Sequence, residues 1–593
     1  MFIAFALGLL APDPLSCFTK EPGSAPASNV CSGTYQLHPG NNVTACATLC
    51  LADSACQAIA MGEADNPSST DCRISHACPK PTSHLDAYDG YTRKPGPCSP
   101  APAPPPAIAF GLEDGLFANG MILQRGASTV VWGRGAAPAS TVTVTVGGVT
   151  KVSTTIAGPA GEWNATLPRV GAMDSTSLSA SDGTSTTTLQ DVAFGDVVLC
   201  GGQSNMGLGM CGTQSKNQTP SQALSVLEPI RVFFQTGSGP KGGAGGSGCP
   251  IEIDGKPAVS RTPALQWFKA NATNAGGFSA VCMLTAQRLY AALDKKVPVG
   301  AVESCVSGTP VGDWTPSNTS ATRGGGVLWE QHMVPLLPMT FKAALWDQGE
   351  SDATFDAGRT SSAYYSQAFP LMISLWRRYF TSALKGGLPF VYVELCTEYG
   401  AEARGKSSFA RSTARSEGGE ARREQFWLAQ RASVAADPSV GFAVTTDIQR
   451  FLHPPDKQDV AARLVLELMR IAYGQPVVSR GPELRSTEPI PGGVVLTFSN
   501  ASLSVRAGIL VGDATTCAAE AGNDTMVMAK GSSLSLHYTI KGDTITVDCP
   551  AGVAAVHVNS DLATCFLYGP HGLPAPPILA NCTGTPTIVE PFR

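Results

Sequence analysis

The pattern of hydrophobic and polar residues changes several times along the 593-residue chain. Over residues 108–190 the two kinds alternate in short runs such as STVTVTVGG and STSLSASDG, separated by Gly, Pro and Asp. This period of two predicts short antiparallel strands of a β-sandwich domain. The alternation returns in GGVVLTFSNASLSVRAG and LSLHYTIKGDTITVDC, which predicts a C-terminal β domain over residues 478–593.

Residues 191–477 follow another pattern, in which continuous hydrophobic runs are separated by helical stretches. DVVLC, VPVGAVES, KAALW, PFVYVEL and GFAVTT are typical of buried strands. SSAYYSQAFPLMISLWRRYF and DKQDVAARLVLELMRIAYG have the spacing of helices. The succession of strands and helices predicts an α/β fold with a doubly wound parallel sheet.

The N-terminal residues differ from the rest of the chain. MFIAFALGLLAPDPLS predicts a signal peptide over residues 1–16, because its hydrophobic run is too short to span a bilayer. Eight cysteines between Cys17 and Cys98 predict a small module stapled by disulfides, whose pairing the sequence leaves open. The proline-rich residues 99–107 predict an extended linker.

The composition indicates in which compartment the protein acts and which classes of partner it lacks. A net charge of −5 offers no basic surface for nucleic acid, and no later segment is hydrophobic for long enough to span a membrane. The chain has 18 cysteines, which favour an oxidising, secreted or luminal location, with the lysosome among the luminal compartments. Eight Asn-X-Ser/Thr sequons support a glycoprotein, and they begin at Asn42, Asn164, Asn217, Asn271, Asn318, Asn500, Asn523 and Asn581.

The residues that could carry out chemistry come directly after the predicted strands. Ligands of open α/β sheets bind at the carboxyl ends of the strands. A hydroxyl, an imidazole, an amide and a glycine turn are what acyl transfer requires: a nucleophile, a base and oxyanion donors. The residues that follow these strands are Ser204, Gly308, Gln348, Glu350, Asp447 and His453.

Each of these residues also has a structural interpretation. Ser204 could cap the next helix, since serine is a favoured N-cap residue. His453 could be an ordinary polar loop residue. The other histidine of this segment, His332, lies in the hydrophobic pattern LWEQHMVPLLPM and is predicted to be packed.

Other site classes do not fit. The chain has no HExxH motif and no CxxC pair, so no metal or organic cofactor is predicted. GGQSNMG lacks the frame of a phosphate-binding loop. Met206 stands where the nucleophile elbow GxSxG has glycine, so the usual α/β-hydrolase arrangement is not predicted.

Four motifs in order, GGQSNM, SGTPVGDW, DQGESD and LHPPDKQDVAARL, resemble the sialate O-acetylesterase family, which are carbohydrate esterases of the SGNH-hydrolase group. The resemblance covers roughly residues 110–580. It includes GLFANGMILQRGASTVVWG and GEWNATLP, which are similar to the family's N-terminal β domain. The cysteine-rich residues 17–98 lie outside it, and CATLCLADSACQAIAM followed by YDGYTR resembles the adhesive apple/PAN module.

The resemblance implies a role for each matching residue. Ser204 would be the nucleophile and His453 the general base. The backbone N–H groups of Ser204 and Gly308 and the side-chain amide of Gln348 would form the oxyanion hole. Residues expected to contact substrate or to orient the site are Gln203, Trp314 and Glu350, although a buried tryptophan could equally belong to the core.

The acid of the triad is left open. SGNH enzymes commonly have aspartate three residues before the histidine, and Arg450 stands at that position here. We select Asp447 as the acid, with Asp456 as the other candidate. A Ser–His pair oriented by a backbone carbonyl and a decayed site are the remaining alternatives.

The sequence therefore predicts a secreted serine esterase that removes O-acetyl groups from carbohydrate without a cofactor. O-acetylated sialic acid is the substrate that the resemblance implies, and acetylated xylan or another glycan is the alternative. A non-catalytic glycan-binding protein on a degenerate esterase scaffold is the rival, because Arg450 and the extra module favour it. In either case the N-terminal module is expected to bind glycan or protein.

Overall fold

The protein is described by a computed structural model, in which two compact units comprise residues Met1–Ile108 and Ala109–Arg593. In the first unit the structure describes five short strands. In the second it describes residues 111–583 with gaps, chiefly 236–248, 318–325, 355–360, 396–425, 432–436, 449–452, 508–520 and 560–564. The predicted signal peptide, the linker and most of the cysteine-rich residues lie outside the described residues.

The first unit contains one antiparallel sheet in the order β1-β5-β3-β4-β2. Its strands are β1 (Phe18–Lys20), β2 (Tyr35–His38), β3 (Ala58–Gly62), β4 (Cys72–Ser75) and β5 (Tyr88–Arg93). The apple/PAN-like interpretation of this module stays a prediction.

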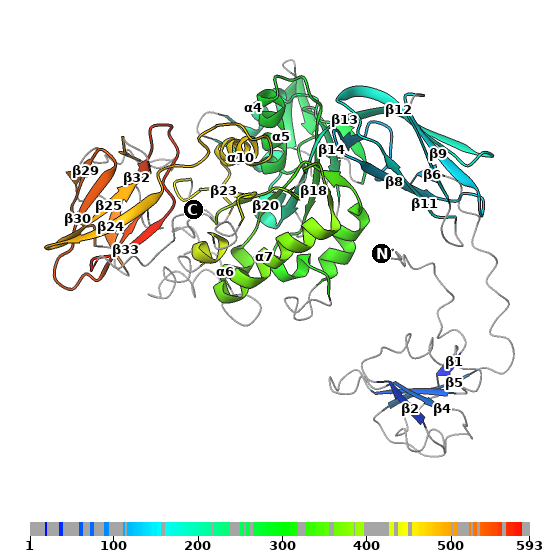
Figure 1. The fold of residues 1–593 in the computed structure, drawn as a ribbon, viewed down its shortest axis with the longest axis horizontal. Helices are drawn as coiled ribbons and strands as arrows, with labels where there is room; N and C mark the ends of the chain where they lie inside the picture. The colour runs from blue at the N-terminus through cyan, green and yellow to red at the C-terminus, as the bar shows by residue number, and fades with distance from the viewer. Residues whose placement is uncertain are drawn as a thin grey trace. The chain divides into compact units, whose positions relative to one another are not determined.

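The second unit is α/β and is centred on a mostly parallel sheet (Figure 1). Its strands run in the order β14-β18-β13-β20-β22-β23, all parallel, and β17 is antiparallel to β14 at one edge. The bounds are β13 (Thr186–Gly202), β14 (Arg231–Phe234), β17 (Trp267–Lys269), β18 (Val299–Cys305), β20 (Ala343–Asp347), β22 (Phe390–Val393) and β23 (Val440–Ala443). Because β13 is central, its end meets those of β18 and β20: Gly202 is opposite Cys305 on one side and Asp347 on the other.

Helices cover both faces of the sheet, as predicted (Figure 1). Along β13, Val197 and Leu199 belong to one hydrophobic cluster, while Val198 and Cys200 belong to another on the opposite face. The first cluster includes Phe369 and the other core residues of α7 (Ser362–Tyr379). The second includes those of α5 (Ala280–Ala292) and α10 (Lys457–Ile471). Two-sided burial explains why these strands are continuously hydrophobic.

The N-terminal β region of this unit is joined to the central sheet without a linker. The predicted boundary at 190/191 lies inside β13, whose first half pairs antiparallel with β12 and whose second half pairs with β18 and β20. Two antiparallel sheets share one hydrophobic cluster here, in the orders β10-β9-β12-β13 and β11-β8-β6. Their strands are β6 (Gly111–Leu112), β8 (Thr129–Arg134), β9 (Thr141–Val146), β10 (Thr150–Thr155), β11 (Trp163–Leu167) and β12 (Met173–Ser181), and β7 (Ile122–Gln124) pairs with β13.

The C-terminal residues form further antiparallel sheets, in the orders β24-β25-β30-β29-β27, β28-β31-β33 and β26-β32. Their strands are β24 (Leu484–Ile490), β25 (Gly493–Phe498), β26 (Ser504–Ala507), β27 (Ala521–Gly522), β28 (Val527–Ala529), β29 (Tyr538–Lys541), β30 (Thr544–Asp548), β31 (Ala555–Val558), β32 (Cys565–Tyr568) and β33 (Ile578–Asn581).

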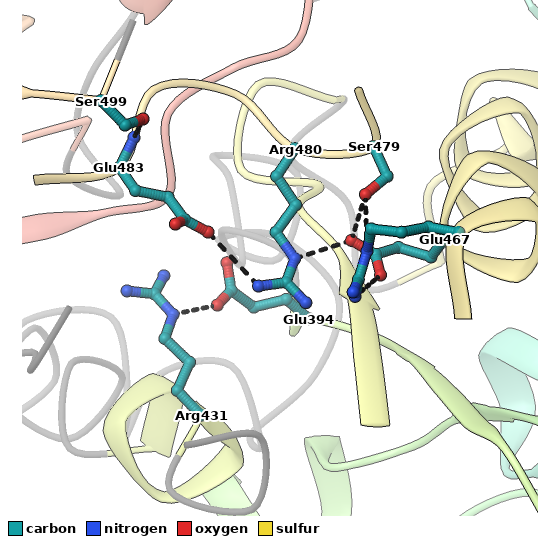
Figure 2. A network of polar contacts seen from close by, with 8 residues as sticks. Glu394, Arg431, Glu467, Ser479, Arg480, Glu483 and Ser499 are labelled. Atoms are coloured by element: carbon teal, nitrogen blue, oxygen red, sulfur yellow. Dashed lines mark hydrogen bonds and ion pairs between the residues drawn. The ribbon is translucent and has the colours of Figure 1, made fainter. Parts of the chain in front are cut away.

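Buried charges connect this β region to the α/β sheet, as Figure 2 shows. Glu467 of α10 accepts hydrogen bonds from Ser479 Oγ (2.9 Å) and Arg480 Nε (2.6 Å). Arg480 also reaches Glu483, just before β24. Beside them, Arg431 donates to Glu394, which follows β22, and to the backbone carbonyl of Pro577. These pairs fix the C-terminal strands against the end of the sheet.

Three disulfides occur among the described residues, Cys200–Cys282, Cys211–Cys249 and Cys549–Cys582. The first ties β13 to α5 directly behind the strand end that precedes Ser204. Such bonds persist in an oxidising compartment, which agrees with an extracellular or luminal location. No helix in the described part of the chain is long and hydrophobic enough to cross a membrane.

Candidate active site

The strand that leads to Ser204 ends in two glycines, and both are required by close contacts. A Cβ on Gly202 would lie 2.2 Å from the carbonyl oxygen of Asp347, and one on Gly201 would lie 2.7 Å from the ring of Trp376. Ser204 then begins the short helix α3 (Ser204–Gly207) and is partly exposed. The N-cap of this helix is Gln203, so Ser204 does not occupy the capping position.

The loop after β18 presents an open backbone at Gly308. Gly308 is exposed, has φ of +73°, and has no atom within 4 Å of the position that a Cβ would occupy. In the described part of the chain, neither the Gly308 N–H nor the Ser204 N–H has a hydrogen-bond partner. Because β13 and β18 are adjacent parallel strands, two unused donors stand at the same sheet edge. Two such donors are what an oxyanion hole requires.

Gln348 lies between two loops of the site. Its side-chain Nε2 donates to the carbonyl oxygen of Thr309 (3.0 Å) and to Oδ2 of Asp352. Asp352, on α6 (Glu350–Thr354), also accepts from the backbone N–H of Val311 (3.0 Å). Both amide hydrogens of Gln348 are therefore used inside the protein, and the side chain braces the Gly308 loop. The predicted donation to an oxyanion stays a prediction and would require the amide to leave these partners.

A cluster of buried polar groups lies behind Ser204. The Asn205 amide nitrogen donates to Oε1 of Glu350, and the Asn205 amide oxygen accepts from Nζ of Lys457 at 2.8 Å. Lys457 Nζ is also 3.8 Å from Oδ2 of Asp347. Burial, followed by the nearby Asp347, raises the pKa of Glu350 to about 7. Glu350 thus contacts the residue after Ser204, and its predicted role in orienting this loop stays a prediction.

His453 lies on a turn that is fixed to the loop after α3. The carbonyl oxygen of Pro455 accepts hydrogen bonds from Gln214 N (2.8 Å) and Thr213 Oγ1 (3.0 Å). His453 itself is partly open to solvent, and its side chain has no hydrogen bond within the described residues. Partial burial, and then the charge of Lys457, lower the pKa of His453. A lowered pKa keeps the imidazole neutral and able to accept a proton at neutral pH.

The two candidates for the triad acid are both used elsewhere. Asp447 is fully buried and receives hydrogen bonds from Arg463 at 2.6 Å and 2.7 Å and from Tyr568 Oη at 2.7 Å. Asp456 is the N-cap of α10 and accepts from Asp459 N at 3.2 Å. Neither carboxylate bonds to His453 in the described part of the chain. Arg450 lies outside the described residues.

Two residues expected near the substrate serve the fold. Trp314 is fully buried, its ring packs edge-on to Trp346 with centroids 5.7 Å apart, and its indole N–H donates to Thr309 Oγ1. Trp314 thus lies in the core, as the alternative interpretation has it, and its contact with substrate stays a prediction. Gln203 is 2% exposed and accepts a hydrogen bond from Ser351 N, so it supports α6. As predicted, His332 is packed inside the protein.

Within the described residues no group of three or more His, Cys, Asp or Glu side chains could hold a metal ion.

Known proteins with similar sequences and structures point to one activity. Sialate O-acetylesterase from Homo sapiens is 28% identical over an alignment of 400 residues that covers 60% of this chain and 70% of that protein. The Rattus norvegicus sialate O-acetylesterase is 28% identical over an alignment of 457 residues that covers 65% of this chain and 77% of that protein. A carbohydrate acetylesterase from Xanthomonas citri has a similar fold, with a TM-score of 0.61, 26% identity, and coverage of 78% of this chain and 98% of that one. The chain is a sialate O-acetylesterase-like carbohydrate acetylesterase. No family model matches it.

For this acetylesterase, sequence reasoning missed the polar residues behind the nucleophile. Asp347, Asp352 and Lys457 were not singled out, although DQGESD and LHPPDKQD contain them. Charged residues are common in surface loops, so only their burial, at 4%, 0% and 2% exposure, distinguishes them.

Proposed function

We propose that the acetylesterase acts through an acetyl intermediate on Ser204, with His453 as general base. The observation that carries the proposal is the meeting of three strand ends: β13 delivers Ser204 between the ends of β18 and β20. The Lys457–Asn205 hydrogen bond brings the segment that follows His453 against α3.

The reaction divides into two acyl transfers. Ser204 Oγ attacks the acetyl carbonyl while His453 takes the hydroxyl proton, and the carbonyl electrons move onto the oxygen. Collapse of this tetrahedral intermediate breaks the bond to the sugar oxygen, which leaves with the proton from His453. Water, deprotonated by His453, then attacks the acetyl–Ser204 ester, and acetate leaves as Oγ regains a proton.

The backbone N–H groups of Ser204 and Gly308 are the proposed oxyanion donors. Each would bond to charge that develops only in the tetrahedral state, where one donor contributes about 3 kcal/mol. A positive φ and open space at Gly308 support this role, because the backbone there can face a ligand directly. Gln348 contributes by bracing this loop through Thr309.

The proposed substrate is O-acetylated sialic acid. The support for it is that curated relatives at 28% identity are sialate O-acetylesterases. A secreted or luminal glycoprotein is proposed for the same chain, because disulfides are present and the sequon residues Asn164 and Asn271 are exposed.

The test is acetate release by the full chain and by Ser204→Ala, on 4-nitrophenyl acetate, 9-O-acetylated sialic acid and acetylated xylan. We expect turnover of the sialic acid ester and a loss of at least about a thousandfold in kcat for Ser204→Ala. If acetate is released faster from acetylated xylan than from the sialic acid ester, the proposed mechanism stands, and acetylated xylan takes the place of sialic acid as the proposed substrate. A folded Ser204→Ala protein with undiminished activity would reject Ser204 as the nucleophile.

A further inference from the structure

Lys457 occupies a position that is unfavourable for a lysine in two ways. It is only 2% exposed, although lysine is almost never fully buried without a partner. It is also the first residue of α10, where the positive end of the helix dipole repels a cation. Asp459, in the first turn of α10, offsets part of the dipole cost. The reason for burying this lysine therefore lies in what its ammonium contacts.

The Lys457 ammonium reaches two other segments of the site. Nζ is 2.8 Å from Oδ1 of Asn205, the residue after Ser204, and 3.8 Å from Oδ2 of Asp347 at the end of β20. The side chain thus crosses from the start of α10 to the helix that carries the nucleophile. A hydrogen bond from a buried cation is among the stronger ones in proteins, because the low dielectric favours it.

Lys457 is also linked through the backbone to the turn of His453. Its own N–H donates to the carbonyl oxygen of Pro455 at 2.9 Å, and the same oxygen accepts from Gln214 N and Thr213 Oγ1. His453 lies four residues before Lys457, on the other side of two prolines. Fixing Lys457 therefore fixes the turn on which the imidazole stands.

We propose that Lys457 is a positioning residue for the esterase reaction, whose buried ammonium holds the turn of His453 against the helix of Ser204. The proposal rests on the proposed function, since it takes Ser204 and His453 as the reacting pair. It gives the site a means of placing the imidazole that does not use Asp447, whose carboxylate is bound to Arg463.

The same charge affects the protonation of His453. Among the titratable groups at this edge are Asp456 and Asp459 at the start of α10, Asp347 at the end of β20, and Glu350 on α6. After partial burial, it is the positive charge of Lys457 that lowers the pKa of His453. Removal of the ammonium is expected to shift the His453 titration to higher pH.

The experiment compares the full chain with Lys457→Met, which keeps the chain length without the charge. Lys342→Met is the matched control, because Lys342 is a partly buried lysine just before β20, at the opposite end of that strand. The His453 titration is followed by NMR of ¹³C-labelled histidine, with the resonance assigned by its absence in His453→Gln. The pH profile of kcat/KM is measured on 4-nitrophenyl acetate.

For Lys457→Met we expect kcat/KM at pH 7 to fall by about tenfold or more. We also expect the His453 titration to shift to higher pH, together with the acid limb of the pH profile of kcat/KM. Lys342→Met should change neither. An unchanged His453 titration and unchanged kcat/KM in folded Lys457→Met would overturn the proposal. A shifted titration without a shifted acid limb would instead reject His453 as the base.

Lys457→Gln provides a second variant if Lys457→Met does not fold. Its amide can still donate to Asn205 but carries no charge. We expect a smaller loss of kcat/KM than in Lys457→Met, with the His453 titration still shifted to higher pH. Full activity together with an unshifted titration would again overturn the proposal.

Discussion

The guanidinium of Arg463 holds both carboxylate oxygens of Asp447, at 2.6 Å and 2.7 Å, inside the protein. Tyr568 of β32 donates to the same carboxylate, so this pair also connects α10 to the C-terminal β region. Asp447 therefore stabilises the fold around the His453 segment, and its role as the acid of the triad stays a prediction.

Asp447→Asn should act on stability first. Removing one partner of a buried ion pair leaves an uncompensated charge and costs about 3–5 kcal/mol. We expect a much lower Tm, with kcat of the folded fraction reduced by less than about tenfold. Scanning calorimetry and kcat at 20 °C check this. A fall in kcat of about ten thousandfold at an unchanged Tm would instead identify Asp447 as the catalytic acid.

Gly308→Ala should separate catalysis from stability. A Cβ meets no atom there, but φ of +73° strains any L-residue by about 1–2 kcal/mol. The backbone is expected to relax and to displace the N–H, so kcat falls by about tenfold or more while KM changes little. Gly552→Ala is the control, because Gly552 has φ of +94° and open space but is remote in the C-terminal β region. Equal kcat in the two variants would argue against Gly308 as an oxyanion donor.

Stability should fall as the pH rises through the neutral range. Burial raises the pKa of Glu303 to about 8 and that of Asp352 to about 7. A carboxyl with a raised pKa in the folded state contributes stability that is full below its unfolded pKa, near 4, and is lost as the pH rises through the folded pKa. We expect Tm to decrease by at least about 3 °C between pH 6.5 and 8.5.

Glu303→Gln tests whether Glu303 causes this decrease of Tm with pH. The amide cannot ionise and can still accept from Ser279 N, as Glu303 does. The decrease of Tm over this range should therefore be smaller in the variant than in the unmodified chain. If Tm decreases with pH as steeply in the variant as in the unmodified chain, Glu303 is already ionised at pH 6.5.

The Cys200–Cys282 disulfide should be resistant to reduction in the folded protein, because both cysteines are fully buried. It closes a separation of 82 residues, for which chain entropy predicts about 4.5 kcal/mol of stabilisation. Cys282→Ala should lower the unfolding free energy by an amount of that order. The measurement includes an alkylating agent so that Cys200 is not re-paired during unfolding. Cys549→Ala, in the C-terminal β region, is the matched variant. If dithiothreitol alone lowers the activity of the folded enzyme, a more accessible disulfide than Cys200–Cys282 is responsible.

Much of the site could be predicted because strand ends are visible in a sequence. DVVLCGG is hydrophobic on both faces and stops at two glycines, so Ser204 had to stand at a sheet edge. Parallel topology then placed Gly308 and Gln348 near it, since the carboxyl ends of parallel strands share one edge.

The sequence alone determined the α/β class, the strand ends and the identity of the groups that could react. It could not decide the partners of the charged residues, because Asp447, Arg463 and Lys457 pair over separations of 16 to 252 residues. The position of Trp314 in the core and the use of both Gln348 hydrogens also depend on packing between distant segments. A side chain's chemistry is local, whereas its burial and its partner are properties of the folded chain. Only the tertiary structure therefore showed that Asp447 is bound to Arg463 and that Lys457 is bound to Asn205, the residue after Ser204.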